Sequence, residues 1–334
     1  MRESRKKILF LIMGPHVPSS KFRVRIYLPL IEKMGWRYDI LDKGTTLVGK
    51  WKILTMASHF QLIFIQKRLY SGFFLRLLRW RNPHILFDFD DALFAKEPTG
   101  KPFRLRKPGT RYTKHRLHRV LKKADWVIAG NNFLADYAKP FAPHVVVIPT
   151  AVNLSDYPPP KKRKNGVVIG WIGTGRNLVY FQVIRNAIKT VAVQFPQVEW
   201  RIISDRTYPM DGVVIRHIPW KEATALMEMS QFDIGLMPLF DDDWSRGKCG
   251  FKILQYMAAS IPTVASPVGV NTALIQDGVT GYLAGSDTQW VEALTRLIEN
   301  EPLRLAMGQN SRRFVEAHFS VDTCWEKLQT LLEY

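Results

Sequence analysis

The chain has 334 residues, 46% of them apolar, which is enough for about two globular domains with substantial cores. It contains no uncharged apolar run of about 18 residues or more, so a membrane-spanning segment is not expected. Its two cysteines, Cys249 and Cys324, exclude a disulfide framework and a cysteine-rich metal site. We therefore expect a reducing, cytoplasmic setting.

The net charge of +19 is unevenly distributed. Residues 1–165 hold 33 Lys and Arg against 11 Asp and Glu, a net +22, whereas residues 166–334 have a net charge of −3. Such asymmetry indicates a polyanionic partner for the first half alone: nucleic acid, an anionic membrane surface or an acidic substrate. A basic face that is merely solvated is the alternative.

In the first half, short apolar runs alternate with amphipathic stretches. The basic start followed by the run 8–13 mimics a signal peptide, but we interpret that run as a buried strand. The pattern predicts further strands at 62–66, 85–89, 126–129 and 145–148, and helices at 25–34, 73–80 and 114–123. This alternation is typical of a parallel sheet with helical crossovers, so residues 1–160 are expected to form a Rossmann-like domain.

Three prolines and a run of charges mark residues 157–166 as an interdomain linker. The pattern then restarts, with strands predicted at 167–172, 200–204, 212–218, 234–237 and 263–265 and a helix at 178–194. Residues 161–318 should form a second Rossmann-like domain. Ser320 is a suitable N-cap for a helix reaching Leu332, and we expect residues 319–334 to clasp the two domains. The fold class is α/β, two doubly wound domains facing across a cleft.

Ligands of such sheets bind beyond the carboxyl ends of the strands. A glycine-containing turn there, between a predicted strand and a predicted helix, offers backbone N–H groups and a helix dipole to a phosphate, and its arginine adds an anion contact. Its residues are Gly173, Thr174, Gly175, Arg176 and Asn177. A tight turn without a ligand is the alternative.

A second loop gathers Arg246, Lys248 and Lys252 at the start of a predicted helix. Three cations at a helix N-terminus oppose the helix dipole unless an anion binds there, so this loop predicts a diphosphate site. Gln255, one turn further on, is placed to hydrogen-bond ribose hydroxyls. Solvated surface cations are the alternative interpretation.

Asp88-x-Asp90-Asp91 begins within the strand predicted at 85–89 and ends directly after it. Two carboxylates one residue apart can hold a divalent ion against a diphosphate. The lysines of the second loop already supply positive charge, so we expect no metal. A strand-end loop that caps a helix is the other interpretation of these acids.

Residues 250–265, GFKILQYMAASIPTVA, together with residues 266–269, 277–283 and 307–319, resemble the donor-binding blocks of glycosyltransferase family 4, also called glycosyl transferases group 1. Residues 22–29, 87–94, 129–131 and 169–173 are similar to a bacterial branch of that family. The likeness extends over nearly the whole chain.

The resemblance implies a GT-B enzyme that retains anomeric configuration and needs no cofactor. The nucleotide diphosphate-sugar is expected on the second domain, and Asp90, Asp91 and Lys252 are the expected catalytic residues. The family's first loop approaches the donor phosphates, which adds Gly14 and Arg23 to the donor site. The expected donor-binding residues are Gly14, Arg23, Gly173, Thr174, Gly175, Arg176, Asn177, Lys248, Gly250, Phe251, Lys252 and Gln255.

The chain departs from the family in one respect. The family commonly has two glutamates eight positions apart, the first near the transferred sugar and the second on the ribose. The matching residues here are Gly247 and Gln255, so neither carboxylate is present. Gln255 keeps the ability to hydrogen-bond a ribose.

The basic first domain is expected to hold the acceptor, a glycan or lipid-linked sugar at the inner membrane face, as in cell-envelope polysaccharide biosynthesis. The segment 67–81 mixes cations with aromatic residues, which suits an anionic membrane interface, although a core helix with snorkelling arginines fits equally. The alternatives are a non-catalytic, epimerase-type or phosphorylase-type nucleotide-sugar binder and a basic nucleic-acid-binding protein. We expect no nucleic acid partner, because the phosphate-ready loops lie in the near-neutral half.

Overall fold

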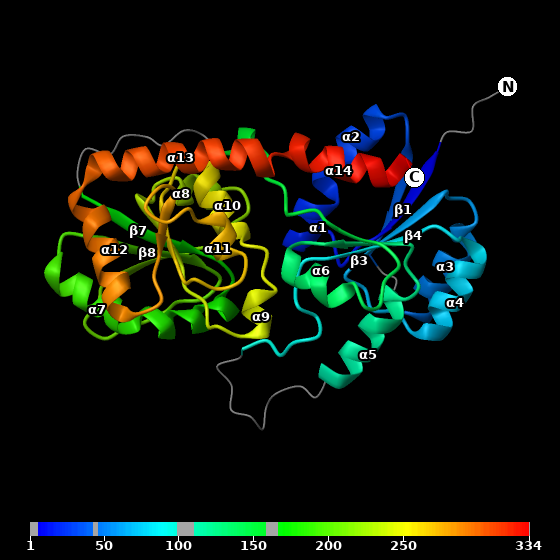
Figure 1. Ribbon diagram of the computed structural model, residues 1–334, viewed down its shortest axis with the longest axis horizontal. Coiled ribbons are helices and arrows are strands. Elements are labelled where there is room, and N and C mark those ends of the chain that lie inside the picture. Colours follow the sequence, from blue (N-terminus) through cyan, green and yellow to red (C-terminus); the bar gives the residue numbers. More distant parts are fainter. Residues whose placement is uncertain (1–5, 43–45, 99–109, 158–165, 334) are drawn as a thin grey trace.

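The computed structural model describes residues 6–42, 46–98, 110–157 and 166–333. Each half of the chain is built around a six-stranded sheet in which every pairing is parallel (Figure 1). The strand orders are β2-β1-β3-β4-β5-β6 and β12-β11-β10-β7-β8-β9. The predicted fold class, two doubly wound α/β domains, is therefore confirmed.

Strands of the first sheet such as LIFIQ in β3 and ILFDF in β4 are buried on both faces, as is usual in a parallel sheet that is covered by helices. Helices α3 to α6 cover one face, and α1, α2 and the last helix of the chain cover the other. The strands are β1 (Lys7–Leu11), β2 (Arg37–Leu41), β3 (Leu62–Gln66), β4 (Ile85–Phe89), β5 (Trp126–Ala129) and β6 (Val145–Val147). The helices are α1 (Pro18–Arg23), η1 (Arg25–Tyr27), α2 (Leu28–Lys33), α3 (Leu47–Ala57), α4 (Gly72–Arg81), α5 (Thr110–Leu121), α6 (Asn132–Ala138) and η3 (Leu154–Asp156).

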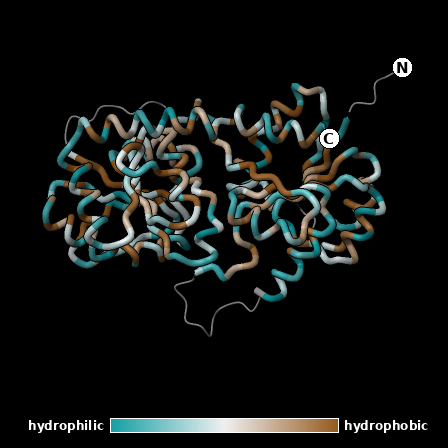
Figure 2. The backbone as a smooth tube through the Cα atoms, in the orientation of Figure 1, coloured by the Kyte–Doolittle hydropathy of each residue, from teal (hydrophilic) through white to brown (hydrophobic). Residues whose placement is uncertain are grey.

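The second half repeats this plan around strands that are also largely buried (Figure 2). Its strands are β7 (Val168–Ile172), β8 (Glu199–Ser204), β9 (Ile215–Pro219), β10 (Ile234–Met237), β11 (Thr263–Ala265) and β12 (Gly281–Leu283). Its helices are η4 (Gly175–Ile184), α7 (Arg185–Gln194), α8 (Ala225–Met229), α9 (Asp243–Arg246), α10 (Phe251–Ala258), α11 (Asn271–Leu274), α12 (Asp287–Glu299), α13 (Glu301–Phe319) and α14 (Val321–Glu333).

Helix α13 runs along the second half, and α14 continues from it to the first sheet (Figure 1). Trp325 and Leu328 of α14 are buried in the same core as Ile8 and Phe10 of β1. The Trp325 ring stacks on Tyr27 with centroids 6.1 Å apart. The predicted return of the C-terminal helix to the first domain is therefore confirmed.

Several predicted elements differ from the structure in their bounds or type. The helix predicted at 25–34 is a 3-10 turn followed by the short α2, and the strand predicted at 212–218 begins at Ile215. The first half of the helix predicted at 178–194 is the 3-10 helix η4. Most of the predicted linker, residues 158–165, lies outside the described residues, as do residues 104–109 of the basic segment before α5.

In the described part of the chain, each helix is too short or too polar to span a bilayer.

Candidate functional site

The two sheets meet through the loops at their carboxyl ends. Asn131, the N-cap of α6, donates from Nδ2 to the Lys248 carbonyl oxygen at 2.9 Å, and the Cys249 thiol lies 3.2 Å from the Asp90 carbonyl oxygen. The rings of Phe22 and Phe251 also pack across this contact, with centroids 4.2 Å apart. The predicted acids after β4 and the predicted cations before α10 are therefore brought to one interface.

Lys248 and Lys252 are the two predicted cations that lie at this interface, and both are largely buried. The Lys252 Nζ lies over the Trp171 ring at 5.2 Å, and the Lys248 Nζ lies over Tyr180 and Trp244 at 5.5 and 5.6 Å. Within the described residues, neither ammonium group is within ion-pair distance of a carboxylate. Aromatic faces thus lie against two positive charges that have no ion-pair partner among the described residues.

Burial is the main influence on the protonation of both lysines. Burial and, to a smaller extent, the positive charge of Lys248 lower the pKa of Lys252 to about 7, although Asp91 partly offsets both effects. Burial also lowers the pKa of Lys248, against the opposing influence of Asp91 and Glu97. An anion bound between the two ammonium groups would reverse these shifts.

Gly173 leaves room for Lys252. A Cβ at this position would lie 2.7 Å from the Lys252 Cε and 2.7 Å from the edge of the Trp171 ring. The residue that directly follows β7 therefore has to be a glycine if Lys252 is to keep its position over the Trp171 indole.

Asp90 and Asp91 of the first half share a cation. The Lys67 Nζ lies 2.9 Å from the Asp90 carboxylate and also hydrogen-bonds Asp91. Although burial works against the ammonium charge, the two carboxylates raise the pKa of Lys67. Burial likewise opposes ionisation of Asp90, but Lys67 and Arg23 overcome it and lower the pKa of Asp90. The side chain of Asp91 stays 31% exposed, so it is the more accessible acid.

Arg23, a predicted donor contact, is paired inside the first half in this structure. Its guanidinium is buried, pairs with Asp88 and donates to the Ile148 carbonyl oxygen at 3.0 Å. Burial raises the pKa of Asp88 while Arg23 opposes this shift. The hydrogen-bond donors of Arg23 are thus used inside the first half, and its predicted contact with the donor stays a prediction. The pairing also occupies the first acid of the Asp88-x-Asp90-Asp91 motif.

The glycine-containing turn after β7 is less available to a phosphate than predicted. The Gly173 N–H donates to the Ile203 carbonyl oxygen, the Gly175 N–H to the Asp205 carboxylate and the Asn177 N–H to the Thr174 carbonyl oxygen. The segment that follows is a 3-10 helix, not the predicted α-helix. Arg176 is exposed and reaches Glu97 of the first half at 3.7 Å. The Asp205 carboxylate thus already accepts from the Gly175 N–H, one of the backbone donors on which the predicted phosphate site depended.

The remaining predicted donor residues have other partners. Arg246 pairs with Asp241 in an exposed position, so a carboxylate already balances its charge. Gln255 is buried and donates to the Tyr157 hydroxyl at 3.2 Å. Gly250 has a φ of 64° at the N-cap of α10. The Gly14 carbonyl accepts a bond from the Val17 N–H within its own loop.

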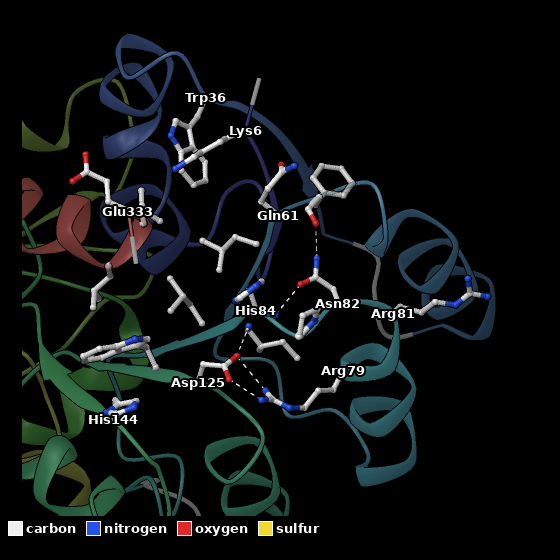
Figure 3. A pocket seen from close by; sticks show the side chains of 18 of the residues that line it. Lys6, Trp36, Gln61, Arg79, Arg81, Asn82, His84, Asp125, His144 and Glu333 are labelled. Atoms are coloured by element: carbon white, nitrogen blue, oxygen red, sulfur yellow. Dashed lines mark hydrogen bonds and ion pairs between the residues drawn. The ribbon is translucent and has the colours of Figure 1, made fainter. Parts of the chain in front are cut away.

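A cavity of about 720 Å³ lies at the opposite end of the first sheet, where the strands begin (Figure 3). It is lined by both apolar and polar side chains, and none of the predicted site residues lines it. The lining residues include Lys6, Trp36, Arg81, His84, His144 and Glu333. This cavity is separate from the interface that holds the lysines and acids.

Comparison with known proteins identifies the second half. Residues 166–300 match the family model of glycosyl transferases group 1. The chain carries a glycosyl transferases group 1 domain. The resemblance that the sequence motifs indicated is thereby confirmed.

Two curated relatives match over part of their length. The D-inositol 3-phosphate glycosyltransferase of Corynebacterium aurimucosum is 29% identical over 93 residues, which are 27% of this chain and 20% of that protein. Glycosyltransferase 1 domain-containing protein 1 of Xenopus tropicalis is 25% identical over 131 residues, 39% of this chain and 36% of that protein. The matched segments thus span about a third or less of either relative.

Solved structures match over nearly the whole chain. A sucrose-phosphate synthase from Thermosynechococcus elongatus superposes with a TM-score of 0.75 at 15% identity, covering 98% of both chains. The Anabaena protein HepE, in complex with UDP-glucose, gives a TM-score of 0.72 at 15% identity, covering 98% of this chain and 100% of its own. These likenesses establish that the fold is GT-B.

The glycosyltransferase domain differs from its family at Gly247, and the structure shows which residue fills the space beside this glycine. A Cβ at Gly247 would lie 2.4 Å from the Ala92 Cβ and 2.9 Å from the Ala92 backbone nitrogen. Ala92 follows directly after Asp91 in the first half. The loop that carries the acids therefore occupies the space that a side chain at position 247 would need.

Sequence reasoning missed three side chains of the site. Lys67, which holds both acids, directly follows β3, so the rule that ligands bind beyond strand ends provided a signal for it. Tyr180 and Trp244, the rings around Lys248, lie in η4 and α9; Tyr180-Phe181 belongs to the residues that resemble the family, but neither ring was predicted to lie at the site.

Proposed function

We propose that this glycosyltransferase moves a sugar, with retention, from a nucleotide diphosphate-sugar to a glycan or lipid-linked acceptor at the cytoplasmic membrane face. One observation carries the proposal: Lys248 and Lys252 are largely buried at the interface, and neither forms an ion pair with a carboxylate of the described residues. Buried charges without partners are strongly unfavourable, and a diphosphate between the ammonium groups would relieve that cost.

The same lysines would act during transfer. Negative charge grows on the diphosphate as the glycosidic bond breaks, and cations held in a water-poor site stabilise it. Lys252 and Lys248 are thus proposed to stabilise the leaving group. No metal ion is proposed, because Lys67 and Arg23 already pair with the acids of Asp88-x-Asp90-Asp91.

The acids of the first half are proposed to act on the acceptor. Asp91 is the exposed carboxylate beside the lysines, so it is placed to accept a hydrogen bond from the acceptor hydroxyl. Asp90 is buried and holds Lys67, which makes it a positioning residue. The net charge of +22 in the first half supports an anionic acceptor there.

The relatives support the donor class. The solved HepE structure contains UDP-glucose, and the Corynebacterium aurimucosum relative is named a glycosyltransferase.

Calorimetry with a panel of nucleotide diphosphate-sugars tests the proposal, followed by an assay of free nucleotide released in the presence of a lipid-linked acceptor. We expect one nucleotide class to bind and Lys252→Met to lose that binding. Failure of every nucleotide to bind would overturn the proposal.

Binding without transfer is a second candidate. The contact between Gly247 and Ala92 favours it, since no carboxylate can enter the position where the family has its first glutamate. Tight nucleotide-sugar binding with no nucleotide release, across a panel of acceptors, would support this candidate over transfer.

A further inference from the structure

Three helices on one face of the first sheet form a surface of a single charge. Helices α3, α4 and α5 lie side by side, with α3 in contact with α4 and α4 with α5 (Figure 1). Together they contain nine Lys or Arg residues and no Asp or Glu. Arg79 pairs with Asp125, and among the described residues the other eight have no ion pair. Positive charge therefore accumulates here without internal compensation.

Large apolar side chains are exposed at the beginnings of the same helices. They belong to Leu47, Val48 and Trp51 of α3, Phe73 of α4 and Tyr112 of α5, and each is between 62% and 85% exposed. A folded protein gains nothing by leaving these groups in water. Their grouping on three adjacent helices indicates a surface that binds a partner.

The beginnings of these helices lie at the functional edge of the sheet. In a parallel sheet each crossover helix starts beyond the carboxyl ends of the strands, where Asp90 and Asp91 also lie. The Arg116 guanidinium donates to the Leu69 carbonyl oxygen at 3.3 Å, so the middle of α5 lies beside the loop that enters α4. Tyr112, one turn earlier in α5, therefore extends past that edge.

We propose that this surface, formed by the five exposed apolar residues and the cations of α3, α4 and α5 other than Arg79 and Arg81, docks on an anionic phospholipid bilayer. Cations attract the headgroups, while aromatic and aliphatic side chains enter the boundary between headgroups and acyl chains. A nucleic acid would leave Leu47 and Val48 without a suitable contact, which is why the bilayer is the favoured partner.

The purpose that we assign to docking, delivery of a lipid-linked acceptor, rests on the proposed function. The docked edge is the one that carries Asp90 and Asp91, so a lipid-linked acceptor would meet the acids from the bilayer side. Docking itself is measurable without turnover.

The test is flotation of the full chain with phosphatidylcholine vesicles, with and without phosphatidylglycerol. We expect binding only when phosphatidylglycerol is present, and weaker binding as salt rises. The double variant K50E/R76E should bind at least about thirtyfold more weakly, and W51S/F73S about tenfold more weakly.

Two controls carry matched changes elsewhere in the first half. K33E/R37E reverses two charges on α2 and β2, and W80S removes an exposed indole from the opposite end of α4. Both should bind vesicles within about twofold of the unchanged protein. Thermal unfolding of every variant checks that the fold is intact.

Each outcome has a defined meaning. Absence of vesicle binding, or equal losses of vesicle binding in the control variants, would overturn the docking proposal. Binding of the unchanged protein to RNA but not to vesicles would also overturn it. Nucleotide calorimetry on K50E/R76E separates the two proposals. Donor affinity that persists while vesicle binding is lost supports the surface. Vesicle binding without donor binding would leave the surface standing and remove the proposed function.

Discussion

Lys67 and Lys252 lie at facing sheet edges, and both are buried, yet their surroundings differ. Lys67 pairs with Asp90 and Asp91, and its pKa is raised. The ammonium group of Lys252 lies over the Trp171 ring and has no ion-pair partner among the described residues, and its pKa is lowered to about 7. The charge of the first lysine is balanced within the protein, whereas the second is proposed to bind an anion from outside. The comparison separates a structural cation from a binding cation.

The largest expected effect comes from removing the paired lysine. Lys67→Met leaves two carboxylates at the interface without their cation, so the free energy of unfolding should fall by about 3–5 kcal/mol. Chemical denaturation measures the change. In the same experiment Lys252→Met should lose less than about 1 kcal/mol or gain stability, because it removes an unpaired buried charge. Equal losses of stability in the two variants would contradict the distinction between Lys67 and Lys252.

Turnover should show the opposite pattern. Lys252→Met removes a cation from the leaving diphosphate, so kcat/KM for the donor should fall about 100- to 1,000-fold. Release of free nucleotide measures the rate. Lys252→Arg keeps the charge and should recover much of the loss. Full activity in Lys252→Met would show that this lysine does not act on the donor.

A smaller effect is expected at Gly173. Its Cβ in Gly173→Ala would meet the Lys252 Cε and the Trp171 ring at 2.7 Å, so the lysine must shift. Nucleotide affinity should fall about tenfold, since misplacing one charged contact has about this effect. Calorimetry measures the affinity. Gly212→Ala, at a glycine with open space around it, is the control for a general effect of the substitution.

The smallest effect should come from removing metal ions. Lys67 and Arg23 neutralise the acids after β4, so a chelator should change the turnover rate by less than about twofold. The assay is nucleotide release with and without EDTA. Loss of activity that Mg²⁺ or Mn²⁺ restores would contradict the metal-free proposal.

The fold could be predicted because its signals are local. Buried strands such as those of β3 and β4 are apolar runs bounded by turns, and their alternation with helices implies a parallel sheet. The errors occur where tertiary contacts decide. Residues 175–184 have the composition of a helix but adopt 3-10 geometry, and α2 is shorter than its pattern predicts.

The site was less predictable because pairing partners lie far apart in the sequence. Arg23 is 65 positions from Asp88, and nothing near it in the sequence distinguishes it from a free anion-binding arginine. The Gly175 N–H is taken by Asp205, 30 positions away. Lys248 and Lys252 were accessible to prediction because their grouping at a helix start conflicts locally with the helix dipole.

The most direct test of the central claim is the proton balance of nucleotide binding. If a diphosphate binds against Lys252, it raises the pKa of that lysine from about 7, and binding takes up a proton when the pH is above 7. Nucleoside diphosphate affinity should then fall as pH rises through 7 to 9. Calorimetry in buffers of different ionisation enthalpy should show proton uptake in the unchanged protein and its loss in Lys252→Arg. Binding with no proton uptake and no dependence on pH would contradict the claim.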